Sequence, residues 1–146
     1  MLFGYVLPFL VVFTILVFVH ELGHYLVAKK FGVTIETFSI GFGPEIFGWT
    51  DKSGTRWKFS IVPFGGYVKY LGDADASSRP DNLEMEKLTD EQKSKTMHAK
   101  TPCQRIWIAA AGPIANYILA IFTFFFLFAT VGQRYVPAKI SDFAQG

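Results

Sequence analysis

Two long apolar blocks constrain this chain more than any other feature of its sequence. The first covers residues 2–19 and continues through a polar cluster to about residue 28, and the second covers residues 106–131 without a charge. A membrane-spanning helix needs about 20 mainly apolar residues. A soluble domain of 146 residues has too little other core to cover two such helices. We therefore expect transmembrane helices over 1–28 and 106–131.

The basic residues between the two blocks predict the orientation of these helices. Of the 14 Lys and Arg residues, 12 lie within 29–105, and Lys29, Lys30 and Arg105 stand close to the predicted helix ends. The positive-inside rule places this segment in the cytoplasm. No positive charge precedes the first block, which argues against a cleaved signal peptide. The net charge of +2 gives no sign of a nucleic-acid partner, and the expected environment is the lipid bilayer.

The cytoplasmic segment has two parts of different composition. In residues 29–72, β-branched residues and a turn signal at 51–54 predict a β-hairpin, and many aromatic residues indicate association with the membrane. Residues 73–105 are polar and predict a linker with a short helix near 81–92. The expected fold is therefore membrane α-helical, with two transmembrane helices joined by a cytoplasmic segment that carries a membrane-associated β-hairpin.

A cluster of ionisable residues, His20-Glu-Leu-Gly-His24, stands where the first apolar block ends. On a helix, His20 and His24 lie one turn apart on one face, so both imidazoles can bind one zinc ion. Glu21 is suited to take a proton from a water molecule that the zinc activates. The alternative is a helix end whose polar side chains reach toward the membrane surface. Because ionisable residues inside a spanning helix usually mark function, the cluster favours a metalloprotease centre.

The second apolar block contains a proline and an amide side chain. Pro113 cannot donate a backbone hydrogen bond to the carbonyl of Ala109, so it loosens the helix there. Asn116 is expected at about the same depth in the membrane as His20. Its amide could hold a substrate backbone, orient a zinc ligand or serve only to pack the two helices together.

Four motifs resemble the N-terminal part of the site-2 protease family of intramembrane zinc metalloproteases, and especially its bacterial branch. That branch cleaves membrane-bound anti-sigma factors and carries periplasmic PDZ domains. The motifs are the His20–His24 cluster, Ser39-Ile-Gly-Phe-Gly-Pro44, Pro63-Phe-Gly-Gly-Tyr-Val-Lys69 and Ala111-Gly-Pro-Ile-Ala-Asn116. The resemblance implies that His20 and His24 are zinc ligands and that Glu21 is the catalytic base.

The same resemblance implies further roles and a location. Gly65, Gly66 and Tyr67 would lie in a β-loop beside the site and bind substrate together with Asn116, and residues 132–146 would begin the PDZ region. The substrate would be a transmembrane protein similar to an anti-sigma factor. The protein would lie in the bacterial inner membrane, with its active site near the cytoplasmic side.

The third zinc ligand of the family is an Asp from a Leu-Asp-Gly motif, and this chain has no such motif in an apolar segment. We expect the other donors of the central segment to be solvated loop residues: Asp73, Asp75, His98 and Cys103. The chain is thus expected to be a fragment of a larger multi-pass protein whose remaining part supplies the Asp, and to be inactive alone. Two other classes stay open: a non-catalytic substrate-binding or scaffold homologue, and a divalent-metal transporter.

Overall fold

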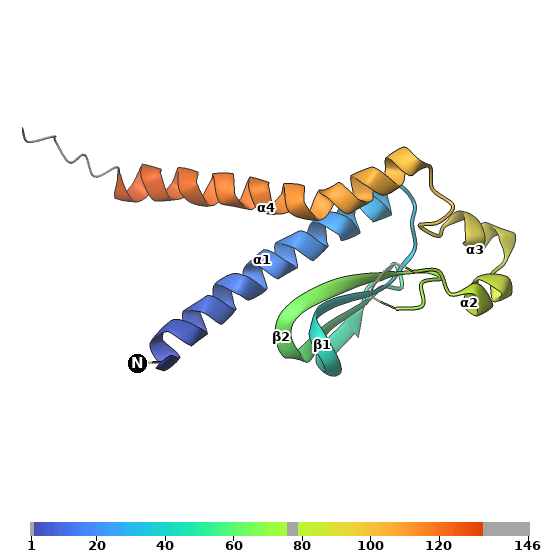
Figure 1. The fold of residues 1–146 in the computed structure, drawn as a ribbon, viewed down its shortest axis with the longest axis horizontal. Helices are drawn as coiled ribbons and strands as arrows, with labels where there is room; N and C mark the ends of the chain where they lie inside the picture. Colours follow the sequence, from blue (N-terminus) through green and yellow to red (C-terminus); the bar gives the residue numbers. More distant parts are fainter. Residues whose placement is uncertain (1, 76–78, 133–146) are drawn as a thin grey trace, which may run out of the picture.

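A computed structural model describes residues 2–75 and 79–132, so the predicted start of a PDZ region lies outside it except for residue 132. The long helices α1 and α4 run in opposite directions, meet where α1 ends and α4 begins, and diverge from there (Figure 1). The sheet lies along the C-terminal half of α1, on the side away from α4 in this view (Figure 1). The elements are α1 (Leu2–Lys30), β1 (Ile35–Thr50), β2 (Arg56–Tyr70), α2 (Asn82–Lys87), α3 (Asp90–Ser94) and α4 (Pro102–Val131).

Both long helices are long and apolar enough to cross a membrane, as the sequence predicts. Their 29 and 30 residues would reach roughly 45 Å at 1.5 Å per residue, more than the roughly 30 Å hydrocarbon core. Helix α4 begins at Pro102, four residues before the predicted start at 106. The reason is a capping box, in which Thr101 and Gln104 satisfy each other's backbone N–H groups ahead of the apolar run.

The predicted hairpin is present as a two-stranded antiparallel sheet, but both strands bend strongly. Residues 35–40 of β1 pair with residues 66–70 of β2. Residues 37–40 also lie beside residues 56–59, and there the two segments run in the same direction. At the bend in β1, a Cβ at Gly41 would lie 2.7 Å from the carbonyl oxygen of Val62, so glycine alone fits there. Within the described part of the chain, residues 66–70 pair on one side only and form a sheet edge.

An aromatic cluster docks the sheet on α1. Phe38 is buried, stacks on Trp57 with ring centroids 4.2 Å apart, and meets Tyr25 edge to face at 5.8 Å. The rings of Tyr25 and Trp57 lie 5.1 Å apart. Tyr25 follows His24 directly and lies one helical turn after Glu21, so this cluster fixes the sheet beside the ionisable cluster.

The segment after the sheet is more ordered than a solvated linker. The side chain of Asp73 is fully buried and its Oδ1 lies 3.2 Å from Nε2 of His98, so the expectation that Asp73 is solvated is wrong. Burial raises the pKa of Asp73, and the contact with His98 only partly opposes this. The short helix predicted near 81–92 is two helices, because Thr89 caps a new helix at Asp90.

Candidate active site

His20 and His24 converge on one point. Their ring centroids lie 4.8 Å apart on consecutive turns of α1. A Cβ built on Gly112 of α4 would lie 2.7 Å from Nε2 of His20 and would also collide with Nε2 of His24. Both Nε2 atoms therefore face the same small space, which the absence of a side chain at Gly112 keeps open.

Each imidazole is held through its other nitrogen. Nδ1 of His24 lies 2.7 Å from the carbonyl oxygen of Ile108, which can only accept, so Nδ1 carries the proton and Nε2 keeps its lone pair. Nδ1 of His20 lies 3.3 Å from the side-chain nitrogen of Asn116. Histidines that bind metals usually donate a hydrogen bond from their second ring nitrogen, as Nδ1 of His24 does here. The positions of the two rings therefore fit one metal ion between both Nε2 atoms, and for His24 the hydrogen bond also leaves Nε2 with its lone pair free.

The contact between α1 and α4 brings Gly112 to the histidines. A Cβ at Gly23 would lie 2.9 Å from the carbonyl carbon of Ala111 and 2.9 Å from Cβ of Ala115. Only a glycine at position 23 allows the two backbones to approach this closely, as small residues do in membrane helix pairs. The sequence places Gly23 inside the ionisable cluster, between Glu21 and His24.

Two cavities adjoin Glu21. One of about 370 Å³ lies between α1, α4 and the glycines of β2, and the other, of about 360 Å³, lies between Glu21, His24 and the sheet edge. The first is lined in part by His20, Glu21, Gly65, Gly66 and Asn116, and the second in part by Glu21, His24, Gly66 and Tyr67. Every residue that the sequence singles out for the site therefore borders at least one of them.

The two glycines of β2 let the sheet edge lie directly against Glu21. A Cβ at Gly66 would be 2.9 Å from Cγ1 of Val17 and 3.1 Å from Cγ of Glu21. Gly65 has a φ of +119°, which side-chain-bearing residues rarely adopt. The ring of Tyr67 stacks on Phe42 of β1 with centroids 6.0 Å apart, so its position depends on the sheet.

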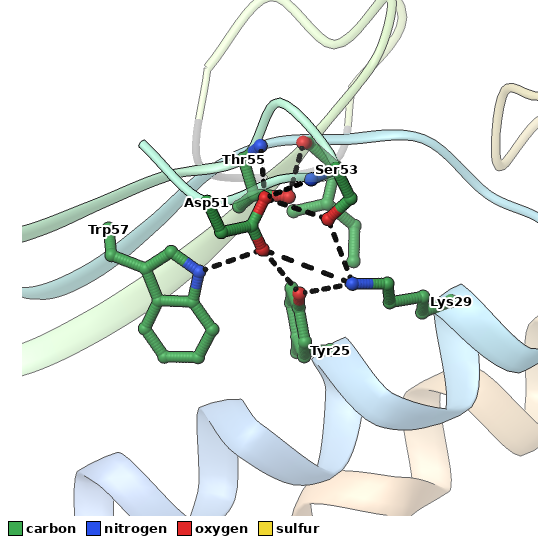
Figure 2. A network of polar contacts seen from close by, with 7 residues as sticks. Tyr25, Lys29, Asp51, Ser53, Thr55 and Trp57 are labelled. Carbon is green, nitrogen blue, oxygen red and sulfur yellow. Dashed lines mark hydrogen bonds and ion pairs between the residues drawn. The ribbon is translucent and has the colours of Figure 1, made fainter. Parts of the chain in front are cut away.

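A polar network around Asp51 fastens the hairpin turn to α1 (Figure 2). The carboxylate accepts hydrogen bonds from Tyr25 Oη at 3.0 Å and Trp57 Nε1 at 3.3 Å. Three more donors belong to the turn itself: Ser53 N, Ser53 Oγ and Thr55 N. Partial burial opposes ionisation of Asp51, but these hydrogen bonds outweigh it and hold its pKa well below the usual range.

Sequence reasoning identified the turn at 51–54 but missed this anchoring role. The available signal was an Asp at the first position of a turn, where its side chain can accept backbone hydrogen bonds. In addition, Lys29 Nζ donates to Tyr25 Oη at 2.8 Å and lies 3.9 Å from Oδ2 of Asp51 (Figure 2). The network therefore joins the turn to the end of α1 at two of its residues.

The described residues, 2–75 and 79–132, contain no group of three or more His, Cys, Asp or Glu side chains placed to hold a metal ion. Of the other donors considered from sequence, Cys103 is exposed and Asp73 is buried against His98. The histidine pair therefore offers two nitrogen ligands and leaves further coordination positions open.

The sequence profile of peptidase family M50 matches residues 8–145 of the chain. The chain belongs to peptidase family M50. This confirms the resemblance to the site-2 proteases that the four motifs indicate. The M50 chain carries the paired histidines on α1 and the Asn116 motif on α4, within the matched range.

Relatives of this M50 chain are named as metalloproteases. The chain is 50% identical over 139 residues to an Agrobacterium fabrum protein whose name places it among the zinc metalloproteases, covering 95% of the chain and 37% of that protein. It is 52% identical over 130 residues to a Rhizobium meliloti protein named in the same way, covering 88% and 35%. It is 39% identical over 145 residues to Metalloprotease MmpA of Caulobacter vibrioides, covering 94% and 36%. The chain thus spans just over a third of the length of these relatives.

Proposed function

We propose that the protein is an intramembrane zinc metalloprotease, which hydrolyses peptide bonds within or near transmembrane segments of membrane proteins. The observation that carries this proposal is the convergence of the Nε2 atoms of His20 and His24 beside Gly112. Membership of family M50 and the names of the relatives support zinc as the metal. When bound, zinc would polarise the scissile carbonyl and activate water for its hydrolysis.

His20 and His24 would supply two ligands to this ion. Catalytic zinc sites generally have three protein ligands and one open position. We expect the third ligand to be an Asp from a part of the protein beyond this chain, which spans just over a third of its relatives. For the same reason we expect the 146 residues to be inactive alone.

Glu21 would act as the general base. Its side chain borders both cavities, so it can take a proton from water there and later deliver that proton to the leaving amine. The cavity of about 370 Å³ falls at the lower end of the range for ligand sites, roughly 300–1,000 Å³. It therefore suits a short extended stretch of polypeptide.

The sheet edge at residues 66–70 would present such a stretch to Glu21. A substrate transmembrane helix hides its peptide bonds in its own hydrogen bonds and must unwind before cleavage. An unwound segment can add as a strand to a sheet edge, where backbone hydrogen bonds hold it. Gly65, Gly66 and Tyr67 would contact it from one side and Asn116 from the other, as their places around the cavities support.

Exposed apolar side chains at the bends of the sheet support its association with the membrane. Ile46, Phe47, Ile61 and Phe64 are each more than half exposed. Large apolar side chains that a fold leaves exposed suit a surface that meets lipid or a membrane-embedded partner. We propose that the protein lies in the bacterial inner membrane with its active site near the cytoplasmic side. Its substrates would be transmembrane proteins similar to anti-sigma factors.

Replacing Glu21 with Gln tests this function in protein expressed from the complete gene and purified in detergent. We expect the variant to retain zinc and to cleave a membrane-protein substrate about 100-fold or more slowly, because it lacks the base. Glu91→Gln, on an exposed surface helix, is the matched control and should cleave normally. Near wild-type cleavage by Glu21→Gln contradicts the assigned role. Substrate binding without cleavage by the wild type favours a scaffold, and zinc flux into liposomes favours a transporter.

A further inference from the structure

Asn116 has an unusual environment. Its side-chain nitrogen lies 3.3 Å from Nδ1 of His20, while its Oδ1 is buried and has no hydrogen-bond partner among the described residues. Asn116 lies one helical turn after Gly112, so both residues stand on the face of α4 that meets the histidines. A buried amide oxygen without a partner is costly and calls for a function.

The proton on His20 depends on which end of this amide faces it. If the amide nitrogen donates, Nδ1 accepts, and the proton of the neutral ring lies on Nε2, which then cannot bind a metal ion. If the amide oxygen faces Nδ1, that nitrogen carries the proton and Nε2 keeps its lone pair. A half-turn of the amide about its Cβ–Cγ bond exchanges the two arrangements. For His24, the carbonyl oxygen of Ile108 already enforces the second arrangement.

We propose that Asn116 is the positioning residue of His20, whose side-chain oxygen accepts the Nδ1 proton when His20 binds the metal. This inference rests on the proposed zinc function. The amide then selects the tautomer that leaves Nε2 free and fixes the ring toward the space beside Gly112. The direct contact with the ring supports the ligand-orienting role for Asn116, in addition to its place at the cavity beside Glu21.

Three variants of the protein, expressed from the complete gene, separate this role from helix packing. Asn116→Leu keeps the approximate size but removes all hydrogen bonding, and Asn116→Asp keeps the size and can only accept. Thr123→Val is the matched control, because Thr123 donates only to the carbonyl oxygen of Leu119 within α4. The readout is zinc affinity, measured by competition with a chelator in detergent.

We expect Asn116→Leu to bind zinc about 10- to 100-fold more weakly, as is typical when the partner of a metal-bound histidine is lost. Asn116→Asp should stay within a few-fold of the wild type, because an oxygen still accepts from Nδ1, and Thr123→Val should match the wild type. If Asn116→Leu does not fold, Asn116→Ala provides the same comparison and should show the same loss.

Two outcomes overturn the inference alone: wild-type zinc affinity in Asn116→Leu or Asn116→Ala, or equal losses in the Asp and Leu variants. The second outcome would show that the amide acts as a donor. A wild-type protein that binds no zinc would instead refute the proposed function, and this inference with it. The two failures are therefore distinguishable in one set of titrations.

Discussion

Replacing Gly112 with Ala should close the space into which the two histidines point. In the structure, the new Cβ would lie 2.7 Å from Nε2 of His20, where ordinary contacts begin at 3.4 Å, so this ring would have to retreat by 0.7 Å. The His24 ring would have to move as well, since its Nε2 also collides with the Cβ. Metal–ligand distances tolerate changes of only about 0.2 Å. The two imidazoles can then no longer share one ion.

The expected result is a folded protein that has lost its zinc. Alanine is more favourable than glycine inside a helix by about 1 kcal/mol, so the helical content of α4 should not fall. Displacements approaching 1 Å can reduce catalysis about 100-fold, so cleavage should fall by at least about that factor. Zinc per chain after dialysis against a chelator, together with circular dichroism, measures both effects.

Gly4→Ala is the matched control for this substitution. It makes the same chemical change in α1, where a Cβ would meet nothing within 4 Å. It should retain zinc and activity at the wild-type level. If Gly112→Ala also binds zinc with wild-type affinity, the Nε2 atoms do not converge on this space and the reasoning is refuted.

Three further changes test the placement of the sheet beside the site. Gly66→Ala puts a Cβ 2.7 Å from the carbonyl oxygen of Ser39 and 2.9 Å from Cγ1 of Val17, so the sheet edge should shift relative to both β1 and α1. Cleavage should fall about 10-fold or more while zinc stays bound; normal cleavage would argue against substrate contact at this edge. Tyr25→Phe removes the hydrogen bonds of its hydroxyl with Asp51 and Lys29 and should cost about 1–2 kcal/mol of stability, seen as a lower thermal midpoint; an unchanged midpoint would show that these two bonds contribute nothing. Because the folded-state pKa of Asp51 is lowered, its stabilising effect is complete above the ordinary value of 3.8 and is lost as the pH falls through the folded-state pKa. Asp51→Asn should therefore be less stable than the wild type at pH 7, with a deficit that shrinks below about pH 4; a deficit independent of pH in thermal melts would refute the role of the charge.

Local features of this protein could be predicted from sequence because their causes are local. The two long helices follow from uninterrupted apolar composition, and the common face of His20 and His24 follows from the helical repeat. The turn at 51–54 follows from its Asp and Gly residues. The apolar pattern predicts the start of α4 four residues too late, because the capping pair Thr101 and Gln104 lies ahead of the apolar run.

Features that depend on tertiary contact could not be predicted in the same way. Residues 37–40 pair with two separate segments of β2, residues 56–59 and 66–69. This pairing cannot be predicted from the alternation of apolar and polar residues along the chain. Asp73 reads as a solvated loop residue because its burial depends on packing against the segment that carries His98. The sequence predicts Asn116 at about the depth of His20, but only the structure shows which ring nitrogen it contacts and that its oxygen has no partner among the described residues.

The most direct test of the central claim is the identity of the atoms that bind zinc. Protein from the complete gene, loaded with zinc in detergent, can be measured for metal content and by X-ray absorption at the zinc edge. We expect one zinc per chain with at least two imidazole nitrogens at about 2.0–2.1 Å, and loss of the metal in both His20→Ala and His24→Ala. A zinc ion without imidazole ligands, or full zinc content in both variants, would contradict the central claim.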